Sequence, residues 1–226
     1  MNKSLSLVIF TFLLTFVSES ALAGVVIGGT RIIYPGEKRE VSLQIDNPDK
    51  VPYLVQSWVE KKEGQKVPFV LTPPVYRSEP GEKNTLRVVK NSNDLSQTKE
   101  SLYWVNIKAI PPNTEAEGTN VLQIAIKSRI KLIYRPESLK GKTPEDVTQE
   151  LKWERTGNKL VVTNPTPYYM NFFNVSLGGQ KIEDATYVAP SSTLSFAIPA
   201  GVGGNTVKWK LISDFGGIGP EHTSNF

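Results

Sequence analysis

The sequence predicts an all-β protein built from two domains. Apolar and polar residues alternate with a period of two in many short segments, which is the pattern of a strand with one buried face. Clusters of Pro, Gly, Asn and Asp separate these segments at short intervals, and no segment keeps helical apolar spacing over three turns. Short strands punctuated in this way are typical of antiparallel sandwiches or barrels.

The first 23 residues have the three parts of a secretory signal peptide. Lys3 precedes an uncharged apolar run over residues 5–17, and Ala21-Leu22-Ala23 forms a small-x-small cleavage site. The run is shorter than the roughly 20 residues that a membrane-spanning helix needs. We therefore expect a mature chain that begins at Gly24, is exported, and has no stable membrane insertion.

Strand patterns then follow one another through the first half of the mature chain. They cover residues 41–45, 53–59 and 103–109, and turn clusters such as "DNPDK" and "SEPGEKN" lie between them. These segments and the long strand described next predict a first domain over residues 24–140.

The longest alternating stretch is "NVLQIAIKSRIKLIYRP", residues 120–136. From Leu122 to Tyr134 its even positions are apolar except for Ser128. Its odd positions from Gln123 to Arg135 are polar, cationic or small, and Ile133 is the one large apolar exception. At roughly 3.3 Å per residue this strand could span about 50 Å, well beyond the usual strand length. Either its first half is covered by the domain's own second sheet, or that half runs along an edge and offers unpaired backbone groups to another protein. Alternation alone does not decide between the two.

The pattern lapses after this strand. Residues 136–147 are polar and contain Pro and Gly, as a linker does. Strand signals resume at residues 160–163, 172–177, 193–198 and 207–211, which predict a second domain over residues 141–226. The tail from Gly216 has little to bury, and we expect it to be loose.

Composition excludes several classes of protein. The chain has no cysteines, so an exported protein of this kind depends on burial without disulfides. The formal net charge is +4, but the 26 basic residues are dispersed among 22 acidic ones. This distribution speaks against nucleic-acid binding and favours a cationic site for an acidic group on a partner.

The sequence gives little support for an enzyme. His222 is the only histidine and lies in the tail, where we expect it to be solvated and unable to serve in a catalytic triad. Neither a metal-ligand cluster nor a nucleotide-binding glycine motif occurs, so no metal and no cofactor are expected. A pair of carboxylates that meets only in the fold stays open as a hydrolase site.

Several motifs together resemble the periplasmic chaperones of the chaperone–usher pilus pathway. They are "TRIIYP" at 30–35, "NPTPYY" at 164–169, "ISDFGG" at 212–217 and above all the strand at 120–136. The resemblance implies two immunoglobulin-like β-sandwich domains set in an L with a cleft between them. It implies a non-catalytic protein of the periplasm that binds pilin subunits, including a tip adhesin, and delivers them to an outer-membrane usher.

This family is itself a known example of recognition by strand addition. A pilin lacks the last strand of its sandwich, and the chaperone lends strand G of its first domain to fill the gap. By the same resemblance Leu122, Ile124 and Ile126 are the donor residues. Arg31 and Lys131 match the cleft pair that grips the C-terminal carboxylate of the subunit.

Further residues carry over with the resemblance. Glu100, Arg135 and Asp214 match a set of salt bridges between the domains, and Arg87 matches a basic position on the cleft side. The short loop before the long strand and the absence of cysteines favour the subfamily with a short F–G loop, which serves rod-like pili. A chaperone without a client could hide its apolar edge in a self-capping homodimer.

One competing hypothesis is a secreted carbohydrate-binding or adhesin-type sandwich. It requires an exposed aromatic platform, for which the candidates are Trp58, Trp104, Trp153 and Trp209. Each of them lies in or beside a predicted strand, and we expect all four to pack in the cores.

Overall fold

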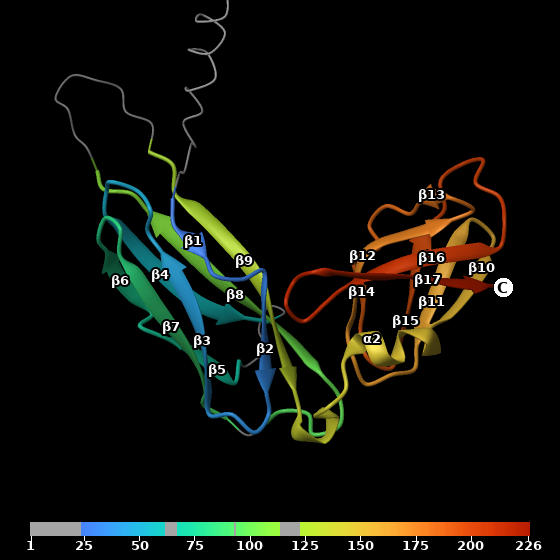
Figure 1. Cartoon of the computed structure of the whole chain (residues 1–226), viewed down its shortest axis with the longest axis horizontal. Coiled ribbons are helices and arrows are strands. Elements are labelled where there is room, and N and C mark those ends of the chain that lie inside the picture. Colours follow the sequence, from blue (N-terminus) through green and yellow to red (C-terminus); the bar gives the residue numbers. More distant parts are fainter. Residues whose placement is uncertain (1–23, 62–66, 93, 114–122) are drawn as a thin grey trace, which may run out of the picture.

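The computed structural model describes residues 24–61, 67–92, 94–113 and 123–226. These residues form two immunoglobulin-like β-sandwich domains that lie at an angle to one another (Figure 1). The predicted signal peptide and Leu122 lie outside the described residues. None of the helices in the described part of the chain is both long and apolar enough to cross a membrane.

The first domain is a sandwich of two sheets. One sheet has the order β1-β3-β7-β5 and the other has the order β2-β9-β8-β4-β6. The strands are β1 (Val26–Ile27), β2 (Arg31–Pro35), β3 (Glu40–Asp46), β4 (Tyr53–Glu60), β5 (Phe69–Thr72), β6 (Val75–Ser78), β7 (Lys83–Lys90), β8 (Ser101–Ile110) and β9 (Ile126–Arg135).

The second domain is a smaller sandwich. A sheet of order β10-β11-β15 faces a sheet of order β13-β12-β16-β17, with β14 paired to β12. The strands are β10 (Lys152–Thr156), β11 (Lys159–Asn164), β12 (Met170–Leu177), β13 (Gln180–Lys181), β14 (Tyr187–Val188), β15 (Ser192–Ala197), β16 (Thr206–Ile212) and β17 (Ile218–Asn225).

Each domain has its own core. Inward-facing positions of both sheets fill the first core, where the rings of Tyr34, Phe69, Tyr103 and Tyr134 stand with neighbouring centroids 5.0–6.2 Å apart. The second core is centred on Trp153 and Trp209, whose centroids are 5.5 Å apart. Two separate cores agree with the all-β, two-domain prediction.

The N-terminal segment changes sheets within a few residues. β1 pairs with β3 of the four-stranded sheet, whereas β2 pairs with β9 of the five-stranded sheet. Gly28 lies at the crossover, and a Cβ there would stand 3.1 Å from the side chain and backbone of Gln44. The β2–β9 pair is parallel, and Arg31 is the register partner of Lys131.

The long strand is shorter than the sequence predicts. β9 begins at Ile126, and residues 123–125 are not in a strand. The cause lies in β8, which ends at Ile110 and is followed by Pro111 and Pro112. Proline has no backbone N–H to donate, so the ladder loses its partner beyond the Ala109–Ile126 pair.

The predicted linker contains short helical turns. They are the 3₁₀ turn η1 (Glu137–Leu139), the helix α2 (Pro144–Val147) and the 3₁₀ turn η2 (Thr148–Glu150). A capping box begins α2, because the Thr143 N–H donates to Asp146 Oδ2 at 2.7 Å while the Thr143 side chain pairs with the same residue. Val147 is buried in the second core, so this segment also anchors that domain.

The prediction of a loose tail is wrong. Residues from Ile218 to Asn225 form β17, which pairs along β16 at the edge of its sheet. An edge strand exposes one side to solvent and tolerates Pro220 and many polar residues, so its sequence lacks the apolar alternation of a central strand.

Candidate functional site

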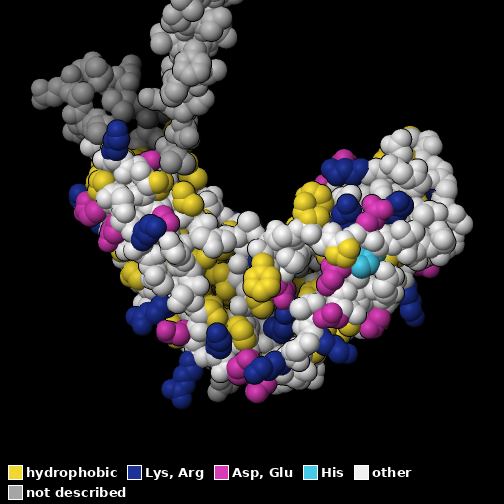
Figure 2. All heavy atoms as spheres, viewed as in Figure 1, with side chains coloured by type: hydrophobic (Ala, Val, Ile, Leu, Met, Phe, Trp, Pro, Cys, Tyr) yellow, Lys and Arg dark blue, Asp and Glu magenta, His cyan; other side chains and the backbone are white. Residues whose placement is uncertain are grey.

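Two cations meet where the first domain faces the second. Arg31 opens β2, and Lys131 lies opposite it on β9, because the two strands are parallel and in register there. The core-facing neighbours Ile32 and Leu132 are buried, so alternation turns both cations to the outer side of the sheet. Both cations contact residues of the second domain from this side, and Figure 2 shows an open notch between the two domains.

The polar partners of both cations come from the second domain. The Lys131 ammonium donates to Asn171 Oδ1 at 2.5 Å and stands 4.5 Å from the ring centroid of Tyr187. The Arg31 guanidinium donates from Nη1 to the Ile212 carbonyl at 3.2 Å, while its Nε is buried without a partner. Among the described residues, no carboxylate forms an ion pair with either cation.

This environment is unfavourable for positive charge. Burial, with a smaller contribution from nearby Arg31, lowers the pKa of Lys131 to about 8. Burial also lowers the pKa of Arg31, although Asp214 partly opposes that effect. A negatively charged group that enters here would compensate the two positive charges, because an opposite charge at short range stabilises a half-buried cation.

An apolar edge leads away from the two cations. β9 pairs with β8 from Ile126 to Tyr134, but it pairs with β2 only from Lys131 onward. In the described part of the chain, the edge of residues 126–130 on the β2 side therefore has no strand beside it. Ile124 and Ile126 are 64% and 47% exposed next to this edge.

Three charged residues join the domains beneath the cations. The Arg135 Nε donates to Glu100 Oε1 at 2.7 Å, and its two terminal nitrogens donate to the Asp214 carboxylate at 2.6 and 2.9 Å. The other oxygen of Glu100 accepts the Tyr169 N–H at 2.7 Å. Glu100 and Arg135 belong to the first domain and Asp214 to the second, so the cluster bridges the two.

The electrostatics of this cluster follow from its burial. Burial raises the pKa of Glu100, and Arg135 and the Tyr169 N–H only partly oppose it. Burial alone would lower the pKa of Arg135, but the two carboxylates outweigh it and raise that pKa. Since Glu100 is 3% exposed, loss of its partner would leave a charge without compensation.

Arg87 does not join the two cations. It lies on β7 in the other sheet of the first domain, where its guanidinium stands 4.0 Å from Glu40 and both side chains are largely exposed. A pair of that kind contributes about 0–1 kcal/mol to stability.

Two further expectations differ from the structure. Trp153 and Trp209 are buried, but Trp58 and Trp104 are partly exposed on the outer side of the five-stranded sheet. There Lys127 stands 5.7 Å from the Trp58 ring and Arg129 stands 4.3 Å from the Trp104 ring. Alternation along β4 and β8 places both tryptophans on the face that is turned away from the core.

His222 is not solvated in a loose tail. Its Nε2 contacts Glu145 Oε1, its Nδ1 lies 2.8 Å from Gln149 Nε2, and its ring stacks on Trp209 with centroids 5.6 Å apart. These contacts attach β17 to the segment that contains α2. Among the described residues, no group of three or more His, Cys, Asp or Glu side chains could hold a metal.

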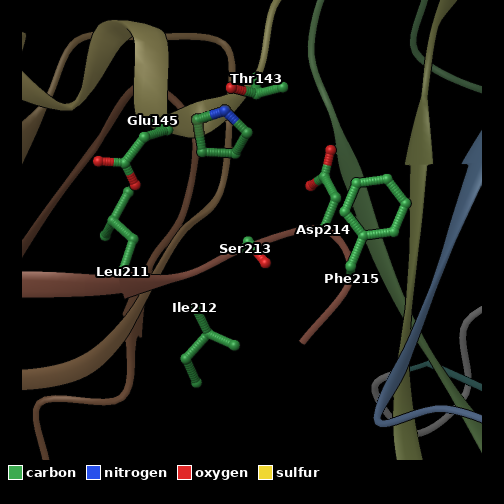
Figure 3. A pocket seen from close by; sticks show the side chains of 8 residues that line it. Thr143, Glu145, Leu211, Ile212, Ser213, Asp214 and Phe215 are labelled. Carbon is green, nitrogen blue, oxygen red and sulfur yellow. The ribbon is translucent and has the colours of Figure 1, made fainter. Parts of the chain in front are cut away.

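The hollows in the structure do not suggest another site. A groove of about 370 Å³ runs between β2, β3 and the β16–β17 loop, and Arg31 and Asp214 are part of its wall. A cavity of about 90 Å³ lies within the second domain (Figure 3). It is lined by Thr143, Pro144, Glu145, Leu211, Ile212, Ser213, Asp214 and Phe215.

Sequence reasoning did not identify Asn171, Tyr187 or the Ile212 carbonyl. Asn171 is an ordinary strand residue in the sequence, and Tyr187 belongs to a two-residue strand. Both acquire a role only when the second domain docks on the first, and no local pattern signals that contact.

Comparisons with known proteins place the chain in a family. Residues 24–140 match the family profile described as "Pili and flagellar-assembly chaperone, PapD N-terminal domain", and residues 146–223 match "Pili assembly chaperone PapD, C-terminal domain". The chain is 43% identical to the probable fimbrial chaperone LpfB of Escherichia coli O157:H7 over 93% of its length and 92% of the relative's. It is 40% identical to the chaperone protein FocC of Escherichia coli, over 93% and 94% of the two chains.

Comparison with a solved structure gives the same family. The Salmonella enterica SafB chaperone, crystallised in complex with the SafA pilin, superposes with a TM-score of 0.84 at 38% identity and covers 92% of this chain and 99% of that one. Both domains of the family are thus matched in order over nearly the whole described chain. The chain belongs to the family of pilus assembly chaperones.

Proposed function

We propose that this chaperone lends the edge of β9 to a pilin subunit and so completes the subunit's unfinished sandwich. The apolar face supports this role, because it is buried at Ile130, Leu132 and Tyr134 of β9 but exposed at Ile126. Ile124, just before the strand, is exposed as well. A client that covers the exposed part would continue the core of the first domain across the interface. Leu122 is proposed as a third donor residue.

Arg31 and Lys131 would anchor the C-terminal carboxylate of that client. This is the observation that carries the proposal: two adjacent half-buried cations have neutral partners and stand at the end of an unpaired strand edge. Hydrogen bonds from charged donors to a carboxylate contribute about 1.5–3 kcal/mol each. Capture of the terminus would also set the register of the client strand along β9, where a slip of one residue would turn its apolar side chains outward.

The geometry favours one direction for the client strand. The free edge spans residues 126–130, and β2 takes over at Arg31 with a parallel pairing. A client strand that lies beside residues 126–130 and has its C-terminus at the cations runs in the same direction as β9. It also lies in line with β2. The main-chain bonds of strand addition would supply affinity that does not depend on the client's exact sequence.

The remaining parts of the proposal follow from the family. We place the protein in the periplasm after removal of residues 1–23, with a first domain over 24–140 and a second over 141–226. The clients are pilin subunits including a tip adhesin, and the receiver is an outer-membrane usher. The role is non-catalytic, a short F–G loop is expected, and a homodimer could cover the edge before a client arrives.

The test is client capture in the periplasm. Lys131→Ala and Arg31→Ala are each expected to reduce co-purification of pilin by about 100-fold, since each removes a charged hydrogen bond and leaves the carboxylate half-paired. The matched control is Lys208→Ala, which removes an exposed lysine that pairs with Glu221 in the second domain. Thermal unfolding of all three variants checks that the fold is intact. Wild-type yields of pilin with the two cleft variants would refute the carboxylate anchor.

The structure does not favour the carbohydrate-binding alternative. The two tryptophans that are not buried, Trp58 and Trp104, lie under the cationic side chains of Lys127 and Arg129. A cationic side chain thus already lies over one face of each ring, where a sugar ring would have to stack.

A further inference from the structure

Asn171 and Tyr187 form a single support for the Lys131 ammonium. They are register partners on the paired strands β12 and β14, so their side chains stand next to each other on one face of the second domain. Asn171 is 4% exposed and accepts the ammonium through Oδ1 at 2.5 Å. The ring of Tyr187 meets the same ammonium at 4.5 Å from its centroid.

Neighbouring residues hold both members of this support. The Asn171 Nδ2 donates to the Tyr169 carbonyl at 3.5 Å, which turns Oδ1 toward the lysine. The rings of Tyr169 and Tyr187 stand 6.0 Å apart, and the Tyr169 N–H donates to Glu100 of the interdomain cluster. The position of the ammonium is therefore tied to the docking of the two domains.

The support is neutral. An amide oxygen and an aromatic face attract a cation, but neither brings a net negative charge. One of the three N–H bonds of the ammonium is used by Asn171, which leaves the others available. A carboxylate at position 171 would instead neutralise the lysine before any client arrived.

We infer that Asn171 and Tyr187 are positioning residues for client capture, which hold the Lys131 ammonium in place while leaving its charge for the client's terminal carboxylate. The inference rests on the proposed function. It assigns the second domain a direct part in capture, although Arg31 and Lys131 both belong to the first domain.

A purely structural role makes a different prediction. If Asn171 served only to dock the domains and did not hold the ammonium that meets the client, an aspartate of the same shape would keep docking and leave capture intact. If the neutrality of Asn171 matters, Asn171→Asp places a competing carboxylate at the site. The two roles thus predict different affinities of the Asn171→Asp variant for a ligand with a charged C-terminus relative to one with an uncharged C-terminus.

The experiment compares two synthetic peptides that carry the C-terminal strand of a pilin subunit, one with a free carboxylate and one amidated. Their affinities are measured for the full mature protein by fluorescence anisotropy. Wild type is expected to prefer the free carboxylate by about tenfold or more, because the carboxylate accepts charged hydrogen bonds that the amide cannot. Asn171→Asp is expected to lose this preference.

Asn158→Asp is the matched control, because it makes the same change of charge at an exposed turn of the second domain. It should keep the wild-type preference. A second pair of variants tests the ring: Tyr187→Leu is expected to lower the preference by about threefold, and Tyr187→Phe, which keeps the ring face, should lose less.

The outcomes separate the two proposals. A wild-type protein without any preference for the free carboxylate overturns the carboxylate anchor itself. A wild-type protein with the preference and an Asn171→Asp variant that retains it overturn the positioning role alone. Should Asn171→Asp fail to fold, a Tyr187→Leu protein with an undiminished preference overturns the positioning role as well.

Discussion

At the scale of single residues, Lys131 carries its charge in an environment that is unfavourable for a cation. Its ammonium is half-buried beside a second cation, and the pKa falls from 10.5 to about 8 as a result. Each unit by which a pKa is lowered corresponds to about 1.4 kcal/mol of differential interaction between the two protonation states. If a client carboxylate binds as we propose, the unfavourable charge becomes favourable in the complex.

This lowered pKa predicts a pH dependence of client capture. Below about pH 8 the free lysine is charged, and the affinity for a peptide with a free C-terminal carboxylate should be constant. Above that pH binding requires the uptake of a proton, because the bound carboxylate raises the pKa of Lys131. Affinity should then fall by up to about tenfold per pH unit. Titrations between about pH 6.5 and 9.5 measure the profile.

Lys131→Arg provides the comparison for this profile. A guanidinium stays protonated over the whole range, so the variant should show a flatter dependence even if its affinity is lower. An unchanged affinity of the wild-type protein from the acidic to the basic limit would contradict the assignment of the charge to Lys131.

Residues differ in how far sequence alone could place them. Arg31, Lys131, Glu100, Arg135 and Asp214 stand in specific motifs, and the structure brings them into the two clusters described above. The roles of Asn171 and Tyr187 depend on docking of the second domain, so no local pattern marks them. The environment of His222 is likewise set by contacts with Glu145 and Gln149, which are distant in sequence.

At the scale of elements, β9 is divided by its neighbours. From Lys131 onward it lies between β2 and β8, and its apolar face belongs to the core. From Ile126 to Ile130 it has β8 alone beside it among the described strands. Alternation in the sequence marks the apolar face equally in both halves and cannot show where β2 begins.

The exposed half of β9 can be changed without harm to the fold. Ile126→Glu is expected to alter the free energy of unfolding by less than about 0.5–1 kcal/mol, because the side chain is nearly half exposed. It should nevertheless reduce pilin capture strongly, since an apolar side chain buried by the client contributes about 1.5–3 kcal/mol and a buried charge is unfavourable. Chemical denaturation and co-purification measure the two effects separately.

Val70→Glu is the control for this change. Val70 is 45% exposed on β5 of the other sheet, so the substitution has the same chemistry at a similar exposure but away from the free edge. Equal loss of capture by both variants would show that general surface charge is responsible. Retained capture by Ile126→Glu would exclude a donor role for that residue.

At the scale of the whole molecule, the Glu100–Arg135–Asp214 cluster bridges the two domains. Arg135 donates three hydrogen bonds to two carboxylates, and the centroid of the Tyr168 ring lies 5.5 Å from the guanidinium carbon. The same docking brings Asn171 and Tyr187 to Lys131 and the Ile212 carbonyl to Arg31. The geometry of the cation site therefore depends on how the two domains dock.

Asp214→Ala is expected to loosen this arrangement while each domain stays folded. The variant loses both hydrogen bonds between Arg135 and the second domain, which should destabilise docking by about 1–3 kcal/mol. Small-angle X-ray scattering should show a broader distribution of interdomain distances, and affinity for the carboxylate peptide should fall by about tenfold.

Lys181→Ala serves as the comparison, because it breaks an exposed ion pair with Glu183 within the second domain. Exposed pairs contribute little, so neither scattering nor affinity should change. A scattering profile of Asp214→Ala identical to that of wild type would show that other contacts alone hold the domains.

The fold as a whole was more predictable than its edges. Central strands such as β3, β4 and β8 have one face in a core. Burial of that face requires apolar residues at alternate positions, and this pattern can be read from the sequence. The edge strand β17 and the turns between residues 136 and 150 are stabilised by contacts with other segments, and their composition reads as loop.

The switch from β2 to an open edge at Arg31 has one more consequence. If Arg31 and Lys131 bind the client's terminal carboxylate as we propose, only a client with a free C-terminus can occupy the site. The chaperone would then select complete clients, because the free C-terminus would be recognised before the client strand pairs along β9.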